Sequence, residues 1–153
     1  MKRRVGYTLV EVFLVLIIIG LLARLGVPRF REMKLRATAT QIVGDVRAVQ
    51  LAVSTLHVDT NGWPSNGAPG TVPNELVAYL PASFSFATPE YELALNVAPP
   101  MSGSPVDNAV VTVDVTSSDP RLLSILALIA QPGLGQYPIG GKYTFVLAGM
   151  GSS

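Results

Sequence analysis

The chain has 153 residues, of which 49% are hydrophobic and 14% charged, a balance that excludes an intrinsically disordered protein. It contains no cysteine and a single histidine, His57, which excludes disulfides, thiolate metal sites and cysteine nucleophiles and leaves little for a histidine-based metal site or a serine triad. The formal net charge of +1 conceals a basic stretch, residues 24–47, followed by an acidic one, residues 57–153. An acidic body argues against a nucleic-acid-binding domain, which carries its basic patch on the folded part.

The N-terminal stretch combines a long apolar run with one carboxylate. Three bases at positions 2–4 precede the run, Glu11 lies within it, and no charge occurs from Val12 to Ala23. Counted from Tyr7, the run is at the short end of the lengths that cross a bilayer. An ionisable group inside hydrocarbon costs roughly 2.5–3.5 kcal/mol on insertion scales, so Glu11 requires a partner. Bases flank the run on both sides, at 2–4 and at 24–36, and give no clear orientation.

A helix is predicted from about Thr8 to about Val58. Pro28 removes one backbone hydrogen bond and is expected to kink this helix, helped by Gly26. The first half is apolar on all sides and requires lipid or packed copies around it. The second half is amphipathic and requires a folded body to lie against. Its apolar stripe has helical spacing and consists of Ile42, Val46, Val49, Val53 and Leu56.

The remainder, residues 59–153, is expected to form a globular head. Turn residues at 59–64 end the long helix, where we expect His57 to be a partly exposed cap or core residue. Asn74 is predicted to cap a short helix, Glu75–Leu80. Three stretches alternate in the manner of strands, at 91–97, 111–116 and 143–148.

A second helix is predicted to begin with Asp119 as its N-cap and Pro120 at its first position. We interpret the apolar run that follows, residues 122–130, as a buried helix crossing from the second strand to the third. The alternative is that its apolar surface is an exposed assembly face. The predicted fold class is therefore α+β: a long N-terminal helix packed on a small antiparallel β-sheet head with one extra short helix.

The hexapeptide Gly6-Tyr7-Thr8-Leu9-Val10-Glu11 resembles the processing site of type IV prepilins and of type II secretion pseudopilins. In that family a basic leader ends in glycine, an aromatic residue comes first in the mature chain, and a glutamate is fifth. Counted from Tyr7, Glu11 is fifth and Pro28 is twenty-second, where the family often has proline. The tyrosine in place of the usual phenylalanine is a mild departure.

The resemblance implies specific roles for these residues. A membrane-embedded prepilin peptidase would cut after Gly6, and Tyr7 would be N-methylated. Glu11 would pair with the free N-terminal amine of a neighbouring copy, so that two groups costly in hydrocarbon neutralise each other. The chain then divides into a leader (1–6), a transmembrane half-helix (7–27), an amphipathic half-helix (28–58) and the head (59–153).

The resemblance predicts a structural subunit of a pilus or pseudopilus, with the choice between the two left open. The subunit would cross the inner membrane once, with its head in the periplasm or extracellular space, and then join a helical fibre. Expected partners are further copies, other pilins or pseudopilins, prepilin peptidase, an assembly ATPase, inner-membrane platform proteins and membrane lipid. The alternative is a single-pass anchored envelope binding module that does not polymerise, with Glu11 snorkelling to the interface.

Catalytic and ligand-binding patterns are weak, and we expect neither an enzyme nor a cofactor or metal site. Glu90 and Glu92 share one strand face, which predicts solvated acids. Asp59-x-Asn61 and Asp107-Asn108 offer oxygen ligands for calcium, but the late loop, residues 131–142, contains no acid. The calcium ligands that some pseudopilins carry in this loop therefore cannot be transferred to this chain.

Overall fold

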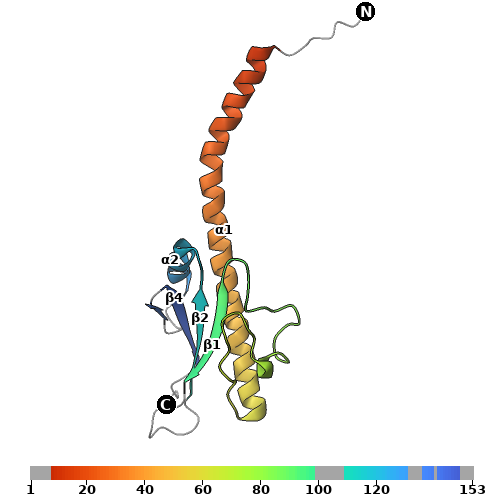
Figure 1. Ribbon diagram of the computed structural model, residues 1–153, viewed down its shortest axis with the longest axis vertical. Helices are drawn as coiled ribbons and strands as arrows, with labels where there is room; N and C mark the ends of the chain where they lie inside the picture. Colours follow the sequence, from red (N-terminus) through yellow and green to blue (C-terminus); the bar gives the residue numbers. More distant parts are fainter. Residues whose placement is uncertain (1–7, 99–108, 131–135, 140, 149–153) are drawn as a thin grey trace, which may run out of the picture. The chain divides into compact units, whose positions relative to one another are not determined.

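A computed structural model describes residues 8–98, 109–130, 136–139 and 141–148 (Figure 1). The elements, in chain order, are α1 (Leu9–Thr60), a 3₁₀ turn η1 (Asn74–Leu76), β1 (Glu92–Ala98), β2 (Val110–Thr116), α2 (Pro120–Ile129), β3 (Gln136–Ile139) and β4 (Lys142–Ala148). The chain divides into two compact units, Met1–Leu35 and Arg36–Ser153. The predicted α+β class, with a long N-terminal helix, a small antiparallel sheet and an extra short helix, is confirmed.

Helix α1 has a defined cap at each end. At its start the Oγ1 atom of Thr8 accepts a hydrogen bond from the backbone N–H of Glu11, at 3.3 Å. At its end Asn61 adopts a left-handed conformation, with φ of 52°, and its N–H donates to the carbonyl of His57 at 2.8 Å. The ring of Trp63 stacks on His57 at 4.0 Å between centroids, so the predicted turn also covers the half-buried histidine.

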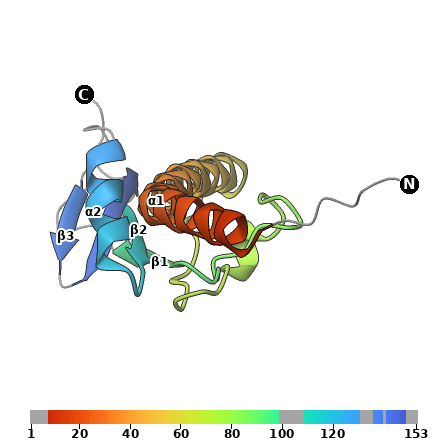
Figure 2. The same cartoon turned by 90° about the horizontal axis from the view of Figure 1, so that it is seen from above.

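Within the second unit, α1 covers one face of the sheet. Its buried side chains are Ala39, Ile42, Val46, Val49, Ala52, Val53 and Leu56, which contain the whole predicted stripe and two further alanines. A polar contact supports the packing at the margin: Gln50 donates from Nε2 to the carbonyl of Leu147 in β4, at 3.4 Å. Figure 2 shows the same arrangement from above, with β1 and β2 beside the helix.

The sheet has four antiparallel strands in the order β1-β2-β4-β3. Leu95, Val113 and Phe145 are register partners across three neighbouring strands, and all three are fully buried. The predicted alternation is confirmed in β2 and β4 and holds in β1 except at Ala94, which is buried between Leu93 and Leu95. The four-residue strand β3 was not predicted; it contains Pro138 and pairs only with β4, at the edge of the sheet.

The opposite face of the sheet is polar and internally bonded. The carboxylate of Asp114 in β2 accepts a hydrogen bond from Thr144 at 2.7 Å and one from Asn96 at 3.2 Å, and lies 3.7 Å from the Nζ atom of Lys142. These cross-strand pairs add modest stability and satisfy the carboxylate. This face is therefore mainly polar, although it also carries the buried Ala94, the register partner of Asp114.

A loop protects the outer edge of β1. The backbone N–H groups of Gly67 and Gly70 donate to the carbonyls of Leu95 and Leu93, both at 2.9 Å. Gly70 has φ of +74°, and a Cβ there would lie 3.2 Å from the Cβ of Ala87, so the turn requires glycine. Because an unpaired edge is a template for uncontrolled strand pairing, this loop protects the edge of β1 from pairing with a strand of another chain.

Helix α2 begins as predicted but is less buried than predicted. Asp119 caps it by accepting the N–H of Arg121 at 2.9 Å, and Pro120 is its first residue. Leu122 and Leu126 are buried and the helix packs on β4, whereas Leu128 is 86% exposed. The expectation of a buried helix therefore holds for one side of α2 and is wrong for the other side, which leaves Leu128 exposed.

The predicted helix Glu75–Leu80 with an Asn74 cap is wrong. The structure has a single 3₁₀ turn, Asn74–Leu76, whose N-cap position is Pro73 and which has no side-chain cap. Backbone turns then carry the chain to Leu80, which is buried together with Leu76. Pro81 prevents any continuation, so burial of two leucines rather than helix capping determines this segment.

The hydroxyl of Tyr91 links the start of the sheet to α1. Tyr91 is 3% exposed, and its hydroxyl donates a hydrogen bond to the carboxylate of Asp45. Burial, and then the Asp45 carboxylate, raise the pKa of Tyr91 well above its ordinary value. The folded chain therefore retains this proton at a pH at which an unfolded tyrosine ionises, near pH 10.

We expect stability to decline in alkali for this reason. The Tyr91 proton contributes to the free energy of unfolding. This contribution is fully present below the pKa of tyrosine in the unfolded chain and is lost as the pH rises above about 10. Tyr91→Phe should lower the free energy of unfolding by about 1.5–3 kcal/mol near neutral pH, since the bond is to a charged acceptor. The variant should also flatten the alkaline decline, measured as the denaturant midpoint of the full chain in detergent between about pH 8 and pH 11. If the denaturant midpoint of Tyr91→Phe declined in alkali as much as that of the wild type, the decline would have to come from other tyrosines.

Candidate membrane-insertion and assembly helix

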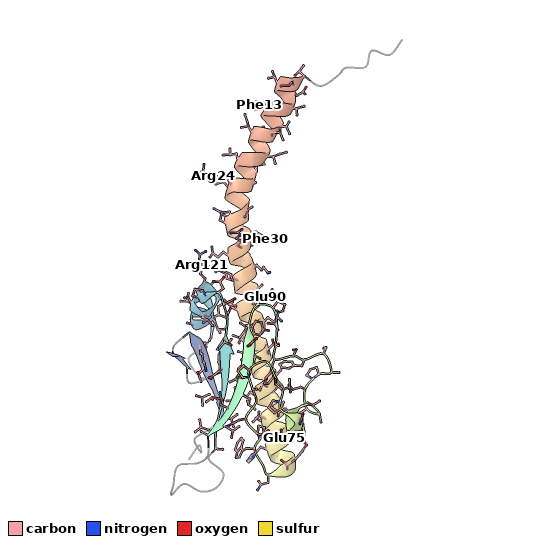
Figure 3. The ribbon with its side chains drawn as sticks, in the orientation of Figure 1. Phe13, Arg24, Phe30, Glu75, Glu90 and Arg121 are labelled. Carbon is pink, nitrogen blue, oxygen red and sulfur yellow. The ribbon has the colours of Figure 1, made fainter. Side chains whose placement is uncertain are left out.

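The N-terminal unit exposes its apolar side chains on every side. From Leu9 to Met33 every large apolar side chain of α1 is exposed, with values from 49% at Val15 and Ile18 to 85% at Leu9. Figure 3 shows these side chains projecting around the helix, with Phe13 and Phe30 labelled. A surface of this extent is not stable in water, so it requires a covering of lipid or of other copies.

This surface has the length and composition of a membrane span. Within α1 an 18-residue window reaches a mean hydropathy of 2.5, and none of that window is buried. A helix from the core of a soluble protein passes the same hydropathy test but is mostly buried. The exposed segment therefore fits a single-pass membrane anchor.

Glu11 places a carboxylate in the first turn of this helix. It is exposed, and it shares a patch of the helix surface with Val12, Val15 and Leu16. The positive end of the helix dipole favours an acid at this position. Among the residues described, none forms an ion pair with Glu11. In hydrocarbon the carboxylate would therefore need a cation from outside the described part of the chain.

The structure describes only some of the other residues that the sequence predicted to be functional. Gly6 and Tyr7 lie outside the described residues. Pro28 lies inside α1, whose helical assignment continues through it, and the kink stays a prediction. Sequence reasoning missed Thr8, whose hydroxyl caps the helix that carries Glu11. The signal was available, because Thr8-x-x-Glu11 is the pattern of a capping box.

The head offers no comparable constellation among its described residues. Glu90 and Glu92 are exposed, as predicted, beside a depression of about 220 Å³ that Thr88, Thr116 and Ser117 also line. No cluster of three or more histidine, aspartate or glutamate side chains able to hold a metal occurs in the described part of the chain. The part of the molecule with a distinctive chemistry is therefore the exposed helix and its carboxylate.

Comparison with known proteins gives several related matches. The chain is 36% identical over 64 residues to the type II secretion system core protein G of Aeromonas hydrophila, a match that covers 42% of this chain and 45% of the relative. It is 34% identical over 65 residues to the protein of that name in Klebsiella pneumoniae, covering 42% and 46%. It is 30% identical over 69 residues to a fimbrial protein of Pseudomonas aeruginosa, covering 45% of each chain.

The chain thus spans under half of the length of the curated relatives it matches. No family model matches it, and no solved structure does. An exposed apolar helix of spanning length and a helix-covered antiparallel sheet fit the general class of α+β proteins with a single-pass membrane anchor. Within that class the secretion-system and fimbrial relatives support a type IV pilin-like protein.

Proposed function

We propose that the chain is a structural subunit of a pilus or pseudopilus fibre. The observation that carries the proposal is the all-round exposure of the apolar helix with Glu11 in its first turn. An anchor alone needs no carboxylate there, whereas a polymer supplies a cation from the next copy. Relatives named type II secretion system core protein G and fimbrial protein support the same role.

In this proposal prepilin peptidase removes residues 1–6 by cutting after Gly6, and Tyr7 then provides a methylated N-terminal amine. The amine pairs with Glu11 of a neighbouring copy and sets the axial register of the fibre. Residues 7–27 cross the inner membrane, residues 28–58 continue the helix, and residues 59–153 form a head in the periplasm or extracellular space. Other pilins or pseudopilins share the fibre, and an assembly ATPase with inner-membrane platform proteins supplies the mechanical work.

Packing in such a fibre differs from packing in a soluble core. Lipid already covers apolar surface, so van der Waals fit and the paired charges drive association.

A membrane-anchored binding module is the competing function, and it leaves Glu11 without a role in association. A structural role agrees with the names of the relatives reported above, type II secretion system core protein G and fimbrial protein.

The mature N-terminus tests this proposal. Mass spectrometry of the chain from cells that contain a prepilin peptidase should show a first residue Tyr7 carrying one methyl group. Gly6→Val should leave the leader attached, because a side chain prevents close approach of the backbone to the peptidase. Gly20→Val is the matched control, since nothing lies within 4 Å of a Cβ built at Gly20. A wild-type chain that keeps Met1, or is cut after Gly26, would contradict the proposal.

A further inference from the structure

Immediately after the apolar run, the exposed helix carries a group of bases. We call Arg24, Arg29, Arg31 and Lys34 the basic collar; all four are exposed, and Glu32 is the only acid among residues 24–34. Among the residues described, Arg24, Arg29 and Arg31 form no ion pair. Three guanidinium groups at the end of a charge-free segment therefore have no partner within the described part of the chain.

The collar surrounds the helix. A helix turns about 100° per residue, so Arg31 lies about 20° from Arg24 around the axis, whereas Arg29 lies about 140° from it. Before a subunit joins a fibre, a single neighbouring protein in side-by-side contact would meet only one of these faces. Lipid headgroups surround a helix that passes through them, and they meet all of the faces.

Apolar side chains alternate with the collar. Leu25, Phe30 and Met33 are 65%, 71% and 69% exposed and lie between the bases in sequence (Figure 3 labels Arg24 and Phe30). Long basic side chains can lay their apolar stems on such residues and extend their charged ends towards phosphate. This mixture is typical of the boundary between hydrocarbon and headgroups and is atypical of a helix in water.

We propose that the basic collar binds the headgroups of anionic phospholipids at the membrane surface where the apolar run ends. Bases near an anionic surface are attracted by its negative potential, and arginine suits phosphate through its paired donors. The collar would fix the depth of the helix and retain the subunit in the membrane. The inference goes beyond fibre formation and holds equally for a subunit that never polymerises.

The lipids retained by the full chain test this inference. The protein is placed in nanodiscs of equal parts phosphatidylcholine and phosphatidylglycerol, and the lipids that remain bound on release are counted by native mass spectrometry. We expect preferential retention of phosphatidylglycerol, by a factor of about five for each engaged base. About 0.5 M salt should reduce this preference, because it shortens the screening length to a few ångströms.

Matched variants locate the effect. Arg24→Gln, Arg29→Gln and Arg31→Gln together should bring the two lipids to equal retention, with helicity by circular dichroism unchanged. Arg47→Gln, Arg121→Gln and Lys142→Gln together remove the same charge from exposed positions of the second unit and should keep the preference.

Two results would overturn the inference. One is lipid retention that does not depend on the collar, seen as equal retention of both lipids by the wild-type chain or as an undiminished preference in the collar variant. The other is collar-dependent crosslinking between copies in nanodiscs of phosphatidylcholine alone, which would assign the collar to protein contact. Neither result bears on cleavage after Gly6, so the fibre proposal is tested independently of this inference.

Discussion

Glu11→Gln is expected to abolish fibre formation while leaving the chain processed and inserted. The substitution keeps the size of the side chain and removes its charge, so a lone subunit enters the bilayer more easily than the wild type. In the proposed fibre, however, the N-terminal amine of each neighbour would be left without a counter-charge. Removing one partner of a buried ion pair costs about 3–5 kcal/mol, which lowers an association constant by about a hundredfold or more.

The measurement is the yield of sheared fibres relative to membrane-bound subunit, with cleavage after Gly6 followed by mass spectrometry in the same cells. Glu92→Gln is the control, because it removes an equal charge from an exposed position of β1. Wild-type fibre yield from Glu11→Gln would refute the pairing of Glu11 with the amine. Loss of cleavage in Glu11→Gln would instead place Glu11 in peptidase recognition.

The elements that local patterns determine were predictable. A stripe at helical spacing identified the buried side of α1, and strict alternation identified β1, β2 and β4. Two members of the helix face were missed, Ala39 and Ala52, because alanine is common on both buried and exposed helix faces. In the candidate site, Glu11 and the charge-free run were identified because they are neighbours in sequence, whereas the Thr8 cap was missed. The roles assigned to Gly6, Tyr7 and Glu11 stay predictions.

The features that were missed depend on distant partners. β3 contains Pro138 and exists as a strand through its pairing with β4, which no local pattern shows. The bond between Tyr91 and Asp45 joins residues 46 positions apart. The turn after Pro73 was mistaken for a helix because Asn74 resembles a cap, whereas burial of Leu76 shapes the segment. Such contacts appear only once the sheet and α1 are placed together.

The contrast between the two sides of α1 leads to the second large prediction, on the stability of the head. Ile42→Ala should lower the free energy of unfolding by about 2–5 kcal/mol, because Ile42 is fully buried and its loss leaves a cavity. Leu51→Ala on the same helix should change it by less than about 0.5 kcal/mol, because Leu51 is 69% exposed. For a chain of this size the difference corresponds to roughly 5–15 °C in unfolding temperature.

Fluorescence of Trp63, which stacks on His57 at the end of α1, reports unfolding of the full chain in detergent. Equal shifts in unfolding temperature for Ile42→Ala and Leu51→Ala would mean that the apolar stripe of α1 is not the face that packs on the sheet. Fibre yield then separates folding from assembly. Leu51→Ala leaves the head folded, so any loss of fibres in that variant must come from contact between copies. Ile42→Ala, by contrast, should reduce fibres only in proportion to the unfolded fraction. In the proposed fibre, repeated addition of identical subunits requires each copy to present the same surface to the next, and a folded head provides that surface.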